Sequence, residues 1–367
     1  MAEHRSHQEV AVKPFNSIGR AEADVADYVI KNLPLSGYSA ERSLGGSQIC
    51  LLEHVWAETF KTTYAIACNS ATSGLFAACL AAEIIPGDEV IVSPYTMSAT
   101  AAAPKMLGAK LVWCDINPWT YTMDYGLCEK LITKRTRAII VTNLFGMPAH
   151  LSALRAIADA HKIFLIEDNA QAIFASERNE LCGTIGHMGV FSLNVHKHLQ
   201  VGEGGIVVTR DPDLDRKLRD AVNHGEMRGG ILGLNLRMTE VTAAMAREQL
   251  RRAPEIMKSR LEFAVELERE VQRQKLWITT PFIRPEASHA FYVWGAQLKR
   301  DVEKVLPPPW KRGYMRPLYH LKALEADHVH LEVVERVESK MVLVEICAHD
   351  PSHDEIVTMV QDLGELL

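Results

Sequence analysis

Long apolar runs are missing from the 367-residue chain, and none approaches the ~20 residues that a membrane-spanning helix needs. An excess of charge is missing as well, because 40 Lys and Arg residues stand against 46 Asp and Glu residues, for a formal net charge of −6. This balance gives no general attraction for nucleic acid or an anionic membrane. Residues 1–13 are polar, so we expect no secretory signal. The remaining expectation is an ordinary globular protein.

Cysteine is present, but not in a pattern that suggests pairing. The chain has 7 cysteines, an odd number, and no Cys-x-x-Cys spacing. We therefore expect neither a disulfide framework nor a structural zinc site. Reduced, buried thiols are the simplest interpretation, and they predict a cytoplasmic protein.

The middle of the chain alternates short apolar runs with helical patterns, and its length predicts about two domains. Helices are expected at 73–85, 96–107, 125–132 and 151–161. Strands are expected at 63–68, 89–93, 110–114, 138–143, 163–167, 189–192 and 205–209. Continuous apolar strands that alternate with helices predict an α/β fold, with a mostly parallel sheet covered on both faces.

The pattern changes near residue 239. A helical stretch at 241–271 is interpreted as the connection from a large to a smaller domain. Residues 277–300 suggest two strands, 342–346 a further strand and 353–363 a closing helix, while 20–31 forms an N-terminal helix. We predict a large domain over 1–245, including the N-terminal helix and loop, and a small α+β domain over 246–367.

Four polar clusters follow the expected strands, where an open α/β sheet binds its ligands. The first, residues 69–74, opens a small-residue helix whose free amides suit a phosphate, although Ser70 or Thr72 could simply cap that helix. The second, residues 167–171, includes Asp168, which can hold a positively charged partner or serve as a helix cap or surface acid.

The third cluster covers residues 191–198 and 202–205, and it includes Lys197 between His196 and His198. Burial would lower the lysine pKa and allow Schiff-base chemistry; the alternatives are a solvent-facing lysine or a metal site, for which no third ligand is evident. The fourth cluster, residues 233–240, opens the long helix, and Asn235 or Thr239 could cap it. The sequence contains no Gly-x-Ser-x-Gly elbow, no Walker lysine loop and no complete Gly-x-Gly-x-x-Gly after a strand.

In their order and spacing, these clusters resemble the DegT/DnrJ/EryC1/StrS family of pyridoxal-phosphate sugar aminotransferases. The resemblance runs from about residue 51 to 250. Its motifs are Asn-Ser-Ala-Thr-Ser-Gly-Leu (69–75), Pro-Gly-Asp-Glu-Val-Ile-Val (86–92), Pro-Tyr-Thr-Met-Ser-Ala-Thr (94–100), Ile-Glu-Asp-Asn-Ala-Gln-Ala (166–172), Phe-Ser-Leu-Asn-Val-His-Lys (191–197), Gly-Glu-Gly-Gly (202–205) and Gly-Leu-Asn-Leu-Arg-Met-Thr-Glu (233–240). It implies the aspartate aminotransferase type I fold, a three-layer structure around a seven-stranded sheet.

The resemblance also implies catalytic roles. Lys197 would form the Schiff base with pyridoxal 5'-phosphate (PLP), which cycles with pyridoxamine 5'-phosphate, and would move the proton between carbon centres. Asp168 would pair with the pyridine nitrogen and keep it protonated, so that the ring accepts electrons. Gln171 would lie beside the phenolic oxygen.

The phosphate of the cofactor would be held by Ala71, Thr72 and Ser192, where the family usually has a glycine in place of Ala71. The resemblance places Asn235 at the phosphate of the neighbouring subunit, which implies a homodimer. Met97 would cover the cofactor face, where the family usually has an aromatic ring.

The implied reaction transfers an amino group from glutamate or glutamine to a keto-sugar, either nucleotide-linked or a related sugar acid. A sugar dehydratase of the same fold, in which histidine replaces the lysine, is one alternative, and a non-catalytic regulatory relative is another. Arg237 is as well suited to a structural ion pair, for instance with Glu240, as to a substrate. The predicted substrate residues are His196, Arg237, Tyr314, Arg316, Tyr319 and His320.

Overall fold

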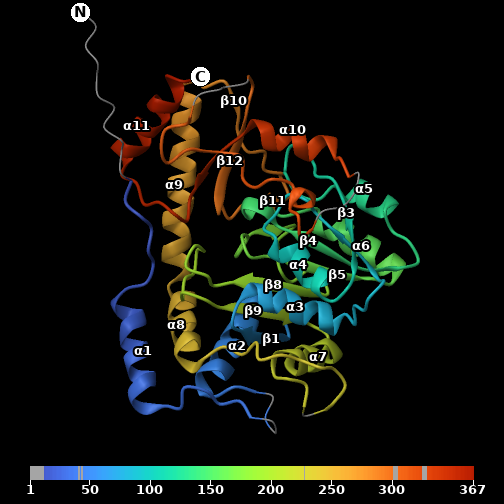
Figure 1. The fold of residues 1–367 in the computed structure, drawn as a ribbon. Coiled ribbons are helices and arrows are strands. Elements are labelled where there is room, and N and C mark those ends of the chain that lie inside the picture. Colours follow the sequence, from blue (N-terminus) through green and yellow to red (C-terminus); the bar gives the residue numbers. More distant parts are fainter. Residues whose placement is uncertain (1–11, 40–41, 43, 227, 301–304, 325–328) are drawn as a thin grey trace, which may run out of the picture.

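The computed structural model describes residues 12–39, 42, 44–226, 228–300, 305–324 and 329–367. Figure 1 shows a large sheet wrapped by helices, with a smaller body at the far end of the long helix α9. Within the described ranges, no helix combines the length and the apolar character needed to cross a membrane.

The large sheet contains seven strands in the order β1-β9-β8-β5-β4-β2-β3. They are β1 (Tyr64–Cys68), β2 (Glu89–Val92), β3 (Lys110–Trp113), β4 (Thr136–Thr142), β5 (Phe164–Asp168), β8 (Met188–Ser192) and β9 (Gly205–Thr209). Strand β9 is antiparallel to both neighbours, and the other neighbouring pairs are parallel. The seven predicted strands are confirmed, because their continuous apolar runs suit a sheet that is buried on both faces.

Helices cover both faces of this sheet, so alternate strand residues enter two separate cores. In β4, for example, Ile140 belongs to one buried cluster and Ile139 to the other. Gly74 of α3 lies against Val190 and Val207, and this close approach needs a small residue. The helices around the large sheet are α2 (Ser47–Phe60), α3 (Ala71–Ala81), α4 (Ala99–Met106), α5 (Tyr125–Lys130), the short η1 (Leu144–Gly146), α6 (Leu151–His161) and α7 (Pro212–Val222).

The connection to the small domain differs from the predicted single helix over 241–271. The chain forms α8 (Glu240–Arg251) and then α9 (Ala253–Arg273), with a break at Arg252. Pro254 lies in the first turn of α9, where its missing amide hydrogen costs nothing, whereas within one continuous helix it would remove a hydrogen bond. The N-terminal helix α1 (Arg20–Asn32) packs against α8.

The C-terminal part contains a four-stranded antiparallel sheet in the order β10-β12-β14-β13, covered by α9 and α11. Its elements are β10 (Ile278–Thr279), β12 (Val293–Leu298), β13 (Lys311–Arg312), η2 (Leu318–His320), α10 (Glu332–Lys340), β14 (Met341–Glu345) and α11 (His353–Gly364). The predicted boundary between the large and the small domain, between residues 245 and 246, stays a prediction.

Residues 277–300 form three strands rather than the predicted two. The additional strand, β11 (Ala287–Ser288), leaves the small sheet and pairs with β6 (Ser176–Glu177), which also pairs with β7 (Glu180–Leu181). This three-stranded sheet ties the segment before β12 to the large part of the molecule.

Candidate active site

A cavity of about 430 Å³ lies at the carboxyl ends of the parallel strands. Residues at or just after the ends of β1, β2, β4, β5 and β8 line it together, because parallel strands end at the same edge of the sheet. The predicted cofactor residues that line the cavity are Ala71, Thr72, Met97, Asp168, Gln171, Ser192 and Lys197.

Lys197 lies in the loop between β8 and β9, with its ammonium nitrogen 4.3 Å from the centre of the Tyr292 ring. A turn fixes the loop, since the Lys197 amide donates to the Asn194 carbonyl at 2.9 Å. Burial lowers the pKa of Lys197 to about 8, although the Asp168 carboxylate opposes this shift. The side chain is therefore a lysine that readily gives a neutral, nucleophilic amine, and the interpretation as a solvent-facing lysine is wrong.

Asp168 is the last residue of β5 and is buried, so it is not a surface acid. Its Oδ2 accepts a 2.6 Å bond from the Thr100 hydroxyl, and its Oδ1 accepts from the Ala170 amide at 3.2 Å. Burial raises the pKa of the carboxyl, while these two donors and the charge of Lys197 lower it. The carboxylate thus faces the cavity with fixed orientation.

Gln171 is buried beside Asp168 and is held at both ends of its amide group. Its Oε1 accepts from the Phe145 amide at 2.8 Å, and its Nε2 donates to the Tyr314 hydroxyl at 2.7 Å. Burial raises the pKa of Tyr314 to about 12, so this phenol stays protonated. One hydrogen of the Gln171 amide remains available to the cavity.

The first turn of α3 also lines the cavity. Ser70 caps this helix by accepting from the Ser73 amide at 3.1 Å, as the capping alternative predicted, and the amides of Ala71 and Thr72 belong to the same open turn. A Cβ atom on Gly205 would lie only 2.5 Å from the Ser70 carbonyl carbon, so β9 can approach this turn only through a glycine. The Ser192 hydroxyl lies at the same cavity.

The two histidines next to Lys197 have different surroundings. The buried His198 ring bonds the Ala290 carbonyl at 2.9 Å, and burial lowers its pKa to about 4. His196 is exposed and lines the cavity. His198 is therefore a structural residue, which leaves His196 as the histidine that a bound molecule can contact.

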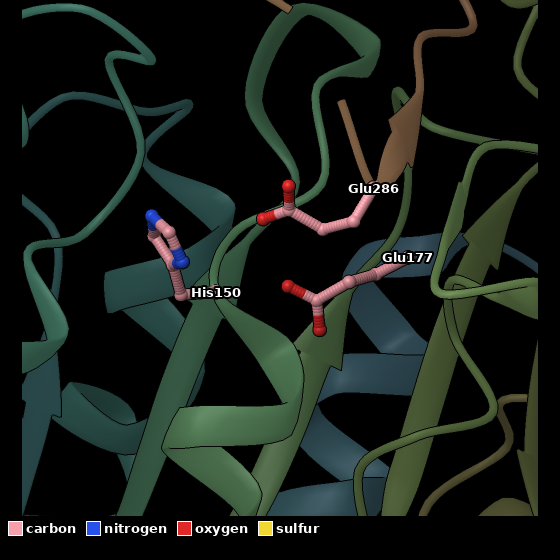
Figure 2. A group of neighbouring side chains, drawn as sticks. All are labelled: His150, Glu177 and Glu286. Atoms are coloured by element: carbon pink, nitrogen blue, oxygen red, sulfur yellow. The ribbon is translucent and has the colours of Figure 1, made fainter. Parts of the chain in front are cut away.

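A second cluster of polar side chains lies elsewhere, where His150, Glu177 and Glu286 point toward one another (Figure 2). Their ligand atoms lie within 4.8 Å, a spacing that would suit a metal ion. The centre is taken by Arg284, whose Nη1 bonds His150 Nδ1, Glu177 and Glu286 at 2.8–2.9 Å. A guanidinium group, not a metal, neutralises these carboxylates.

Asn235 and Arg237 lie outside the cavity lining. Asn235 is exposed and accepts from Arg237 Nε at 2.8 Å, while Arg237 Nη1 donates to Asn223. The suggested ion pair of Arg237 with Glu240 is wrong, because the Glu240 carboxylate accepts instead from the amides of Gly46 and Gln48. The helix cap in this segment is Thr239, which accepts from the Thr242 amide.

The predicted substrate residues near the C-terminus are only partly brought to the cavity. Tyr314 reaches its edge through Gln171. Tyr319 is buried and donates to Glu335 at 2.6 Å, and His320 pairs with the same carboxylate at 3.0 Å. Arg316 is exposed. Of the six predicted substrate residues, all of them described, His196 is the one in the cavity lining, and the substrate roles of the others stay predictions.

The profile of the DegT/DnrJ/EryC1/StrS aminotransferase family matches residues 38–306. The chain belongs to this family. It is 31% identical over 322 residues to GDP-perosamine synthase of Caulobacter vibrioides, covering 85% of this chain and 86% of that protein. It is 40% identical over 208 residues to UDP-N-acetyl-3-dehydro-alpha-D-glucosamine 3-aminotransferase of Acidithiobacillus ferrooxidans, covering 56% of each.

A solved aminotransferase of this fold, from Psychrobacter cryohalolentis, superimposes with a TM-score of 0.87 at 26% identity, covering 96% of this chain and 97% of that one. The predicted α/β fold, a mostly parallel seven-stranded sheet of the type I aminotransferase kind, is thereby confirmed. The family resemblance drawn from the cluster motifs is confirmed as well.

Sequence reasoning missed several residues around the site, and three of them contact its principal side chains. Thr100 bonds Asp168, Tyr292 lies under the Lys197 ammonium, and Phe145 holds Gln171 through its amide. Thr100 stands in the Pro-Tyr-Thr-Met-Ser-Ala-Thr motif, so the motif carried a signal for it. Tyr292 immediately precedes β12, far from Lys197 in the sequence, and no local sequence pattern marks it as a site residue.

Proposed function

We propose that this chain is a PLP-dependent aminotransferase that moves an amino group from glutamate or glutamine to a keto-sugar. The observation that carries the proposal is the placement, around one cavity, of a lysine with lowered pKa, a buried carboxylate and an open helix N-terminus. Membership in an aminotransferase family gives the same reaction class.

The chemical groups that line the cavity fit PLP. An amine can bind the aldehyde, a carboxylate can pair with the ring nitrogen, and helix amides with a nearby hydroxyl can hold the phosphate. Lys197, Asp168 and the first turn of α3 supply these groups in that order. Gln171 keeps an amide hydrogen for the phenolic oxygen. When bound, the cofactor supplies an electron sink that stabilises negative charge at the substrate carbon.

The protein residues then do the acid–base work. Lys197 takes the substrate proton and returns it at the new carbon, which a side chain with a pKa of about 8 does in both directions near neutral pH. Asp168, ionised, holds the ring nitrogen in its protonated form. Because Lys197 is retained where the related dehydratases carry histidine, amino transfer is favoured over dehydration.

The proposed assembly is a homodimer, in a cytoplasmic setting. Asn235 lies outside its own cavity and is exposed, as a residue that reaches a partner's phosphate must be. All seven cysteines are free, and six of them are buried, which suits a reducing compartment.

The proposed acceptor is a nucleotide-linked keto-hexose. The named activities of the relatives support this class, since they include a GDP-sugar and a UDP-sugar aminotransferase. His196, exposed at the cavity, is the side chain we assign to the sugar hydroxyls. Neither nucleic acid nor a membrane is a proposed partner.

The test uses the absorbance spectrum of purified protein with added PLP, recorded before and after glutamate and then after a keto-sugar nucleotide. We expect a long-wavelength band from the lysine-bound cofactor, its loss with glutamate, and its return with the acceptor, together with an amino-sugar found by mass spectrometry. Lys197→Ala should abolish the band and all multiple turnover.

Lys130→Ala, which alters an exposed lysine at the end of α5, is the matched control and should behave as wild type. Multiple turnover by Lys197→Ala would refute the assignment of this lysine. A wild-type product that lacks a hydroxyl and has gained no nitrogen would instead establish the dehydratase.

A further inference from the structure

Three buried threonine hydroxyls form a continuous hydrogen-bonded chain that ends on Asp168. Thr142, the last residue of β4, donates to Thr96 at 3.1 Å, and Thr96 lies 3.1 Å from Thr100, the second residue of α4. Thr100 donates to Asp168 Oδ2 at 2.6 Å. None of the three threonines is more than 3% exposed, so water does not replace these bonds.

When Asp168 is ionised and can only accept, counting hydrogens fixes the direction of every bond in this chain. Each hydroxyl has a single hydrogen to donate. Thr100 gives its hydrogen to Asp168, so the hydrogen in the bond between Thr96 and Thr100 comes from Thr96. Thr142 in turn donates to Thr96. All three O–H dipoles therefore point along one line toward the carboxylate, and each polarises the next.

The chain acts on a carboxylate that burial alone would drive toward protonation. Burial raises the pKa of Asp168, and the opposing contacts are Thr100, the Ala170 amide and the charge of Lys197. The other titratable group that faces Asp168 is Tyr314, which stays protonated. The charge on the Lys197 nitrogen varies, because the imine that it forms with a carbonyl compound gains and loses a proton. The bonds from Thr100 and Ala170 to Asp168 are the permanent stabilising contacts.

We propose that the Thr142–Thr96–Thr100 chain is a positioning device that keeps Asp168 ionised and oriented toward the ring nitrogen of the cofactor. This inference rests on the proposed function, because it assigns the purpose of the chain to the PLP ring. Thr100 is a positioning residue, since it acts through Asp168 and does not line the cavity. The other carboxylate oxygen accepts the long 3.2 Å bond from the Ala170 amide.

The test compares Thr100→Val, which keeps the shape and removes the hydroxyl, with Thr100→Ser, which keeps the hydroxyl. Two quantities are measured: the Kd of the apoprotein for PLP, and the pH midpoint at which the visible band of the lysine-bound cofactor titrates. We expect Thr100→Val to raise the Kd for PLP about tenfold or more, because an Asp168 carboxyl without this donor is less fully ionised and pairs less well with the ring nitrogen. Thr100→Ser should stay within about twofold of wild type.

The pH midpoint separates this role from simple packing. A ring nitrogen that is less fully protonated withdraws fewer electrons from the lysine-bound carbon, so the midpoint should rise in Thr100→Val and not in Thr100→Ser. Thr142→Val removes the first hydroxyl of the chain and should shift both quantities in the same direction by a smaller amount. Because Thr142 also lines the cavity beside Asp168, Thr142→Ser, which keeps the hydroxyl, is its matched control and should behave as wild type. If Thr100→Val does not fold, Thr142→Val still allows the Kd for PLP and the pH midpoint to be measured.

The possible results have distinct meanings. Thr100→Val or Thr142→Val with a wild-type Kd and midpoint overturns the inference while the proposed function stands. Equal losses in Thr100→Ser and Thr100→Val also overturn it, because the hydroxyl would then be irrelevant. A wild-type protein that shows no visible band with PLP overturns the proposed function and this inference together.

Discussion

Arg284 should be a sensitive position for stability away from the cavity. The side chain is 5% exposed and joins the segment before β11 to the loop before α6. Its Nη1 donates to Glu177 and Glu286 and contacts His150 Nδ1, the three side chains of Figure 2. Its Nη2 donates to the carbonyls of Pro148 and Ala149 at 3.0 and 2.8 Å.

The expected loss in the free energy of unfolding of Arg284→Ala follows from the buried polar groups that the substitution leaves without a partner. Glu177, 3% exposed, loses its charge partner, although its second oxygen keeps two bonds from Ser152. Breaking a buried pair by removing one partner costs about 3–5 kcal/mol. The two carbonyls lose their donors as well, so we expect the free energy of unfolding to fall by at least ~3 kcal/mol.

The assay is equilibrium unfolding in urea, with and without Zn²⁺. Arg284→Ala also empties the centre of a His and two-carboxylate cluster, a ligand set that zinc accepts. Zinc should therefore raise the urea midpoint of Arg284→Ala and leave wild type unchanged, because the guanidinium occupies the position in wild type. Arg20→Ala, in an exposed pair with Asp24, is the control and should stay within about 0.5 kcal/mol of wild type.

Two results would refute this reasoning. A loss of less than about 1 kcal/mol in Arg284→Ala would show that the carboxylates and carbonyls find other partners, most simply water. Equal stabilisation of wild type and variant by zinc would show that the metal binds elsewhere or displaces the arginine.

Two further predictions concern the cavity. The rate at which the apoprotein combines with PLP should rise with pH through a midpoint of about 8, since the neutral amine of Lys197 is the reactive form. Stopped-flow absorbance measures this rate. A midpoint near ~10.4, the pKa of an ordinary lysine, would contradict the argument that burial lowers the pKa of Lys197. Gly205→Ala should raise the Kd for PLP by at least about tenfold, because the Cβ atom of the alanine would displace the Ser70 carbonyl and the first turn of α3. In the control Gly230→Ala, where a Cβ meets nothing within 4 Å, binding titrations should give the wild-type Kd.

Much of the large sheet was predictable because its physical signal is local. A strand buried on both faces reads as a continuous apolar run, and all seven runs became strands. The gathering of most of the predicted cofactor residues at one cavity was predictable for a related reason, because parallel strands end at one edge and motifs at the ends of different strands meet there. Their roles toward the cofactor stay predictions. Helices α2 and α7 were missed, although in α2 the buried residues Ile49, Leu52, Trp56 and Phe60 follow helical spacing.

Other features could not be predicted, because they depend on contacts between distant segments. The hydroxyl of Tyr314 accepts a hydrogen bond from Gln171, 143 positions away, a pairing that the sequence did not indicate, while the substrate role of Tyr314 stays a prediction. Arg237 was considered as a partner of Glu240, which instead holds the amides that begin α2. Neither pairing has a local signature, since each forms only when the chain has folded.

The sequence by itself determined the family and the order of the strands along the chain, and it singled out Lys197 and Asp168 as the proposed reactive pair. These depend on residue type and spacing, which folding does not change. Only the tertiary structure decided the environment of that pair: the lowered pKa of Lys197, the hydroxyl chain behind Asp168, and the arginine inside an apparent metal cluster. Burial and hydrogen bonding are properties of the surroundings, and the surroundings come from segments that are far apart in the sequence.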